Sequence, residues 1–120
     1  MSTPEPERVA DVTARISEEI AGIHRRSYGE AVESIETHIV DDLVVCVLDI
    51  RLLPHERTLL DHDRGEDSIR RVRKEFQESI GATFAATVEH STGRRVIGFV
   101  SETHLDPAFS VEIFKLAPAD

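Results

Sequence analysis

A chain of 120 residues with a single cysteine fits one domain that folds without disulfide bonds. Its net charge of −9, with no Trp and one Tyr, argues against nucleic acid, whose phosphates would repel it and whose bases need aromatic partners. No apolar run reaches the ~18 residues of a membrane span and no signal peptide is evident, so we expect a cytoplasmic protein without direct membrane insertion.

The first third of the chain predicts a helix followed by a hairpin. Residues 1–7 are typical of a disordered leader. From about Glu7 to Tyr28, before Gly29, apolar residues recur at steps of three or four, which predicts one apolar helix face. These residues are Val9, Val12, Ile16, Ile20 and Ile23. Asp41-Asp42 then separates two predicted strands, at 32–40 and 43–52.

The second of these strands has the clearest alternation in the chain. One face is apolar throughout, with Val44, Cys46, Leu48, Ile50 and Leu52. The other face begins with Leu43, Val45 and Val47 and ends with Asp49 and Arg51. We therefore expect one face in the core and the other reaching solvent toward its end.

The middle of the chain predicts a short and a long helix. Pro54 suits the first turn of a helix that runs to about His62, before Gly65. A long helix from about 66 to 90 follows, with an apolar stripe that predicts contact with the sheet. The stripe consists of Ile69, Val72, Phe76, Ile80, Phe84 and Val88. Gly81 within it costs about 1 kcal/mol relative to Ala, and a close approach to the sheet or to a second helix would explain that cost.

The last segment predicts a second hairpin. Gly93 ends the long helix, and strands at 95–100 and 109–116 flank a polar connection at 101–107. The prediction is an α+β fold in a single domain over residues 8–117, with a tail at 118–120. Its order is N-terminal helix, β-hairpin, short helix, long helix and second β-hairpin, with a four-stranded, mainly antiparallel sheet covered by helices and a mixed sheet as the alternative.

Several segments of the chain resemble the MpsC-like family. They are Leu53-Pro54-His55-Glu56-Arg57-Thr58-Leu59, Val72-Arg73-Lys74-Glu75-Phe76, Val88-Glu89 with Thr92-Gly93-Arg94-Arg95-Val96, and Val111-Glu112-Ile113-Phe114-Lys115-Leu116. The resemblance covers roughly residues 8–116, and its specificity lies in the ordered set. Members usually carry a Gly-basic-Gly-Pro signature after the first helix, where this chain has Gly29-Glu30-Ala31-Val32 and keeps one glycine.

This family takes its name from a component of a sodium-translocating system that generates a membrane potential. The resemblance therefore implies a non-enzymatic accessory or regulatory role, with a protein partner at a membrane transport or energy-coupling system. It supplies no catalytic residues and implies no cofactor.

A basic patch gives an alternative hypothesis. Arg70, Arg71, Arg73 and Lys74 cluster on the long helix. Guanidinium groups bind carboxylates and phosphates bidentately, so a sensor domain could bind a small anion or nucleotide near Arg51, Arg70 and Arg73. The simpler interpretation is a solvated face with local ion pairs worth ~0.2–0.5 kcal/mol each.

Three other sets of residues could take part in metal binding or catalysis, but each has a simpler structural explanation. His55, Asp61 and His62, with Asp63, could hold a metal in a metal-dependent enzyme, but neighbouring residues at a helix end point in different directions. His104 and Asp106 could act together on a ligand, although Asp106-Pro107 is typical of a turn. Cys46 is expected to be a small core residue without a catalytic partner. We therefore expect no enzyme and no metal.

The apolar surface exceeds what a thin two-layer domain covers easily. Isologous dimers are the commonest oligomers, so we expect a homodimer with the first helix or the edge strand 32–40 in the interface.

Overall fold

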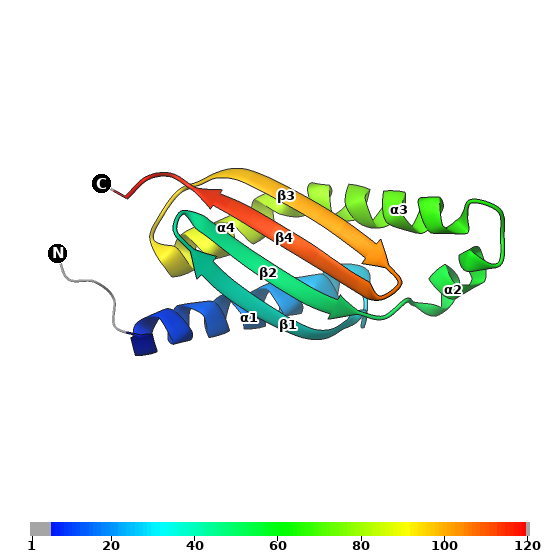
Figure 1. Cartoon of the computed structure of the whole chain (residues 1–120), viewed down its shortest axis with the longest axis horizontal. Coiled ribbons are helices and arrows are strands. Elements are labelled where there is room, and N and C mark those ends of the chain that lie inside the picture. The colour runs from blue at the N-terminus through cyan, green and yellow to red at the C-terminus, as the bar shows by residue number, and fades with distance from the viewer. Residues whose placement is uncertain (1–5, 120) are drawn as a thin grey trace.

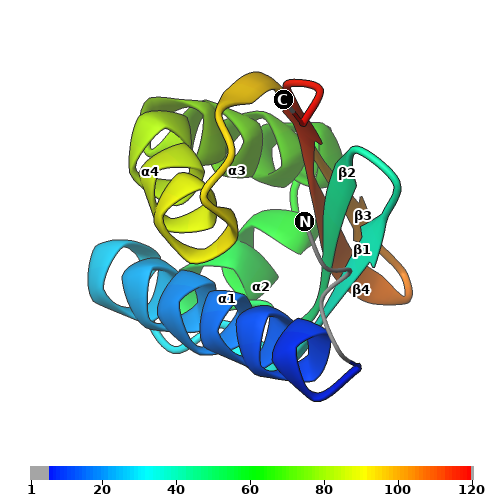
Figure 2. The same cartoon turned by 90° about the vertical axis from the view of Figure 1, so that its left-hand side faces the viewer.

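The computed structural model describes residues 6–119 as one antiparallel sheet with helices on one of its faces (Figures 1 and 2). The elements are α1 (Pro6–Tyr28), β1 (Val32–Val40), β2 (Leu43–Ile50), α2 (Pro54–Leu60), α3 (Gly65–Ser79), α4 (Gly81–Thr92), β3 (Val96–Leu105) and β4 (Ala108–Leu116). The strand order is β1-β2-β4-β3, and each neighbouring pair is antiparallel. The α+β prediction is confirmed, and the sheet is not mixed.

The first helix and hairpin follow the prediction closely. α1 begins at Pro6, two residues before the predicted domain start, while residues 1–5 of the predicted leader lie outside the described residues. β1 and β2 join through Asp41, at a φ of 52°, and Asp42. The predicted apolar face of β2 is buried from Val44 to Ile50, but β2 ends at Ile50 and the half-buried Leu52 lies beyond it. Together with Ile16 and Ile20 of α1 and Phe84 and Val88 of α4, this face forms the core.

The predicted long helix is wrong in one respect, because it is two helices. α3 and α4 meet at Ile80, whose φ of −101° and ψ of 6° interrupt the helix. A Cβ on Gly81 would lie 3.1 Å from the ring of Phe99 in β3, so the helix meets the sheet where only glycine fits without displacement. The expected close approach at Gly81 is confirmed.

The predicted stripe on this segment also needs correction at one position. Val72 is 45% exposed, whereas Arg73 and Gln77 are 1% exposed and lie on the inner face with Ile69. These three residues follow one another at four-residue steps, so the buried face of α3 is largely polar.

The second hairpin is longer than predicted. The supposed polar connection is mostly strand, because β3 continues to Leu105 and only Asp106 and Pro107 form the turn. Polar residues suit this strand because they pair across the ladder: the hydroxyls of Thr103 and Ser110 lie 2.8 Å apart on opposite residues of β3 and β4.

The chain is thus built from two halves of similar plan. In each half a helix precedes a hairpin: α1 precedes β1 and β2, and α4 precedes β3 and β4. The inner strands β2 and β4 pair in the middle of the sheet and join the halves. α1 packs on β1 and on α4, while α3 packs on β3 and the small helix α2 packs on α3.

Candidate functional site

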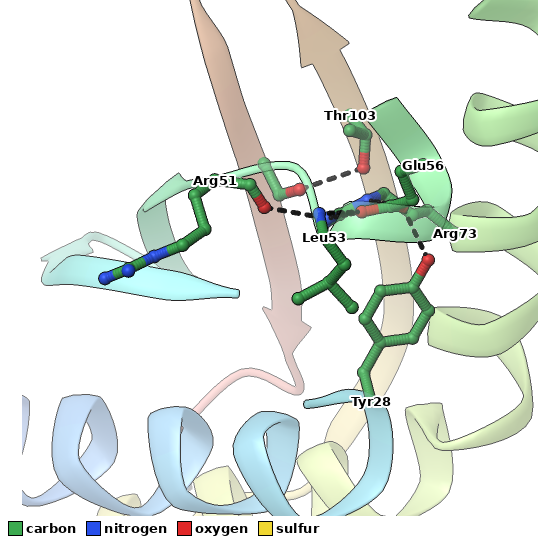
Figure 3. A network of polar contacts seen from close by, with 7 residues as sticks. Tyr28, Arg51, Leu53, Glu56, Arg73 and Thr103 are labelled. Atoms are coloured by element: carbon green, nitrogen blue, oxygen red, sulfur yellow. Dashed lines mark hydrogen bonds and ion pairs between the residues drawn. The ribbon is translucent and has the colours of Figure 1, made fainter. Parts of the chain in front are cut away.

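Four segments of the chain meet at a buried ion pair between Glu56 of α2 and Arg73 of α3 (Figure 3). The guanidinium donates two hydrogen bonds of 2.7 Å to the carboxylate, from Nε to Oε2 and from Nη2 to Oε1. Nη2 also donates to the carbonyl oxygen of Arg51, after β2, at 3.1 Å. Bidentate charge-assisted pairs of this kind are strong and fix the relative orientation of their partners.

Tyr28, the last residue of α1, completes this cluster. Its hydroxyl donates to Glu56 Oε2 at 2.7 Å, and its ring centre lies 4.9 Å from Arg73 Cζ. The backbone N–H of Leu53 donates to Glu56 Oε1 at 2.8 Å. We call Tyr28, Leu53, Glu56 and Arg73 the latch, because it joins α1, α2 and α3.

Electrostatics keep the latch carboxylate charged. Burial alone would raise the pKa of Glu56, but hydrogen bonds from Arg73, Leu53 and Tyr28 outweigh it and lower the pKa below its ordinary value. Burial, and then the hydrogen bond to Glu56, raise the pKa of Tyr28. A charged, fully hydrogen-bonded carboxylate suits a structural role better than proton transfer.

His24 lies one turn before Tyr28 in α1 and is 1% exposed. Its ring packs edge-on against Phe76 with centroids 5.6 Å apart. Burial, and then the charge of Arg73, lower the pKa of His24 to about 4. The imidazole is therefore neutral at pH 7.

A second set of buried polar side chains crosses the sheet beneath the helices. Paired positions of β1, β2, β4 and β3 carry Thr37, Cys46, Glu112 and Ser101. Helix side chains bond both ends of this polar row: Ser17 Oγ of α1 lies 2.7 Å from Thr37 Oγ1, and the Ser101 hydroxyl donates to Gln77 Oε1 of α3. The row thereby ties α1 to the edge strand β1 and α3 to the edge strand β3.

Glu112 is the unusual member of the polar row. It is fully buried, and neither carboxylate oxygen has a hydrogen-bond partner among residues 6–119. Burial raises its pKa to about 8, against the opposing effect of Ser101. The side chain is therefore mostly protonated at pH 7, which avoids a buried, unpaired charge.

The opposite face of the sheet has no helix over it in residues 6–119 (Figure 2). We call this surface the outer face. At its centre are half-buried or exposed apolar side chains from three strands, Val45, Val47, Val100, Val111 and Ile113. An antiparallel sheet with one solvated face usually carries polar residues there. An apolar centre is instead typical of a contact surface.

The sequence matches over residues 9–118 the family described as "Na+-translocating membrane potential-generating system (MpsC)". The chain belongs to the MpsC family. The resemblance expected from the sequence is confirmed. No curated protein and no solved structure matches the chain.

Two of the segments that suggested the MpsC family meet at the latch. Glu56 lies in the segment 53–59 and Arg73 in the segment 72–76, and the ion pair joins them. The altered family loop lies beside it: Gly29 has a φ of 123°, a conformation that favours glycine, and the Ala31 carbonyl accepts a hydrogen bond from Arg51 N–H at 2.8 Å. The glycine kept by this chain is the residue that the backbone requires.

The three arginines of the anion hypothesis form separate contacts in this MpsC-family chain. Arg73 is buried against Glu56, exposed Arg70 pairs with Asp67 at 2.7 Å, and exposed Arg51 lies 3.7 Å from Glu33. In Figure 3 the Arg51 side chain points away from Arg73. An anion at Arg73 would have to compete with a bidentate carboxylate.

The other candidate residues lie apart on the surface. His55, Asp61, His62 and Asp63 are exposed around α2, and the described residues contain no group of three or more His, Cys, Asp or Glu placed to hold a metal. His104, near the end of β3, has its Nδ1 2.8 Å from the Pro107 carbonyl oxygen in the β3–β4 turn.

The expected core role of Cys46 is confirmed, because the residue is fully buried. Burial raises the pKa of its thiol to about 11, against the effect of the hydrogen bond from Thr37.

Sequence reasoning missed Glu56, His24 and Glu112 as buried polar residues. A signal existed for Glu56, because it stands three residues after Leu53 and two after Pro54, where a carboxylate can cap the helix. Glu112 offered a weaker signal, since it alternates with Ser110 and Phe114, which share its face. His24 lies on the apolar side of α1 without a distinguishing pattern.

The described part of this MpsC-family chain contains no helix with both the length and the apolarity of a membrane span. α1 is long enough at 23 residues, but charged side chains recur along it.

Proposed function

We propose that this chain is a non-enzymatic, cytoplasmic accessory or regulatory module of a membrane Na+-translocating system and acts through protein contacts. The family description supports the link to such a system. The observation that carries the contact role is the outer face, whose apolar centre spans β2, β4 and β3.

The distribution of polar groups also supports a contact role. The buried side chains of Glu56 and Arg73 bond to each other, to Tyr28 and to neighbouring backbone groups. Catalysis by acid–base transfer needs a proton donor or acceptor within reach of a substrate. The latch instead holds three helices in place and leaves the outer face as the surface available to a partner.

The test is complementation in host cells that lack this chain, with Na+-dependent membrane potential as the readout. The wild-type chain should restore the potential, and Val111→Lys at the centre of the outer face should not. Val72→Lys is the matched control, because Val72 is an exposed valine on α3 and receives the same charge. We expect it to behave as wild type.

A second arm tests whether chemistry is involved. His55→Ala and His62→Ala should each complement fully, because these exposed side chains lie around α2 and not on the outer face. Loss of complementation in either of them, with Val111→Lys still active, would contradict the proposal. Tagged wild-type chain should in addition co-purify with subunits of the Na+-translocating complex from native membranes.

A further inference from the structure

We infer that a second copy of this chain occupies the outer face, so that two sheets pack face to face with helices on the outside. This inference rests on the proposed contact role and names the partner of that surface. It places the homodimer interface on the sheet, not on the first helix or the edge strand that the sequence suggested.

The apolar centre is continuous across three strands. Val45 of β2 pairs with Ile113 of β4, which pairs with Val100 of β3. In the next row, Val47 pairs with Val111. Residues directly opposite in an antiparallel ladder share a face and contact one another, so these five side chains form one patch. Val100 is 54% exposed at its margin.

The area suits a modest dimer. Four strands at ~4.8 Å spacing and eight residues at ~3.3 Å rise give a face of about 500 Å². Two copies would bury about 1,000 Å² in total, close to the lower limit for a specific interface. Two sheets packed in this way lie ~10 Å apart, with their side chains interdigitating.

Polar and charged groups around the patch are complementary under one two-fold axis. An axis that crosses the strands between the Val45 row and the Val47 row exchanges the two rows. His38 of one copy then lies over Glu36 of the second copy, since these residues occupy the two rows on β1. The same axis brings Lys115 of one copy over Phe109 of the second copy, one strand away from its Asp49. Such pairs fix register and favour one partner orientation.

The alternative surfaces are less suitable for a second copy. The β1 edge, which the sequence suggested, carries the exposed charged residues Glu33 and Glu36, and at the β3 edge Lys74 of α3 lies 3.2 Å from Glu102. The exposed side of α1 carries charged residues, such as Arg15, Glu18 and Arg26. These features oppose apolar docking at each of these places.

The experiment measures mass by size-exclusion chromatography with light scattering across a concentration series. Wild-type chain should elute at twice its 13.4 kDa mass. Val111→Lys should weaken the dimer ~100-fold or more, because each copy then buries an ammonium group against the apolar Ile113 of the second copy. It should still fold, since Val111 pairs with Glu102 and the new lysine gains an opposite charge beside it. Val72→Lys should leave the dimer unchanged.

A charge-swap arm keeps the test decisive. Val111→Glu alone should also be monomeric, and an equimolar mixture of Val111→Lys and Val111→Glu should form a mixed dimer. Circular dichroism confirms that each variant is folded. A wild-type chain that stays monomeric at millimolar concentration, or a dimer that survives Val111→Lys, overturns the inference.

The two proposals fail in different ways. A monomeric wild type whose Val111→Lys variant loses complementation overturns the dimer and leaves the contact role standing. A dimer broken by Val111→Lys with complementation intact supports the dimer and overturns the contact role.

Discussion

At the scale of single residues, the latch stabilises the fold only while the hydrogen bonds between its residues are made. Taking Glu56 and Arg73 out of water costs several kcal/mol per ion, and this cost is offset only while the hydrogen bonds around them are made. Four hydrogen bonds reach the Glu56 carboxylate, from Arg73, Tyr28 and Leu53 N–H. Replacing only one residue of the Glu56–Arg73 pair should therefore destabilise the fold more than replacing both.

The first prediction concerns this asymmetry. Arg73→Met should lower the free energy of unfolding by ~3–5 kcal/mol, because it leaves a buried carboxylate without its counter-charge. The double variant Glu56→Leu with Arg73→Met should lose less than Arg73→Met alone. Urea unfolding measures both. Arg70→Ala is the control, since its exposed pair with Asp67 should contribute no more than about 1 kcal/mol.

The second prediction concerns pH and rests on Glu112 and His24. Folded Glu112 keeps its proton to about pH 8, whereas the unfolded residue loses it near 4.5, so the free energy of unfolding falls as pH rises through this window. His24 is protonated near 6.5 when unfolded and only near 4 when folded, so its effect is a rise in stability with pH between these values. Between pH 6.5 and 8, only the Glu112 effect of these two remains.

Stability should therefore decline between pH 6.5 and 8, by up to about 1.4 kcal/mol per pH unit. Glu112→Gln should flatten this decline, because the amide resembles the protonated acid and cannot ionise. Glu102→Gln, at an exposed position beside the sheet edge, should keep it. An unchanged slope in Glu112→Gln, measured by urea unfolding at several pH values, would refute the assignment.

At the scale of the elements, two glycines respond to alanine in opposite directions. In α1, a Cβ on Gly22 would meet the flexible tip of Arg26 at 3.2 Å, so Gly22→Ala should raise the free energy of unfolding by ~0.5–1 kcal/mol. At the start of α3, a Cβ on Gly65 would lie 1.8 Å from the Leu59 carbonyl oxygen. Gly65→Ala should lower the free energy of unfolding by ~1–3 kcal/mol, because the backbone must shift.

Thermal unfolding of both variants tests this difference. Equal shifts in the melting temperature would contradict the close packing of the α2–α3 junction, since helix propensity alone favours alanine at both sites.

The sequence predicted elements well where one periodicity governed a whole segment. The alternation from Val44 to Ile50 specified the buried face of β2, and it also predicted the apolar start of the outer face. The break at Ile80 was not predictable, because apolar spacing continues through it from Phe76 to Phe84 and only the backbone angles of Ile80 show the interruption. β3 was predicted too short, since the polar residues that extend it pair across the ladder.

The latch shows why the candidate site was harder to predict than the fold. Arg73 shares a helix face with Ile69 and Gln77, a position that the spacing alone marks as inward. An arginine there is favourable only with a partner, and Glu56 stands 17 residues earlier in another helix. Long-range pairing of this kind leaves no local pattern, so the sequence placed Arg73 on a solvated face.

At the scale of the whole molecule, one layer of helices and one sheet leave the apolar centre of the outer face without cover among residues 6–119. The sequence indicated an excess of apolar surface and hence a homodimer, which stays a prediction. It could not identify the surface, because that depends on all helices lying on the same side of the sheet (Figure 2).

The two-half plan has a consequence for how the protein could be divided. A chain cut after Asp63 would yield two fragments, each with a complete hairpin and its preceding helix, and with Glu56 and Arg73 on opposite sides of the cut. We expect the separately produced fragments to reconstitute the native fold on mixing, and Arg73→Met in the second fragment to impair this reassembly. Fluorescence titration of one labelled fragment with the other would measure this reassembly. Fragments that do not bind each other would show that folding requires an unbroken chain.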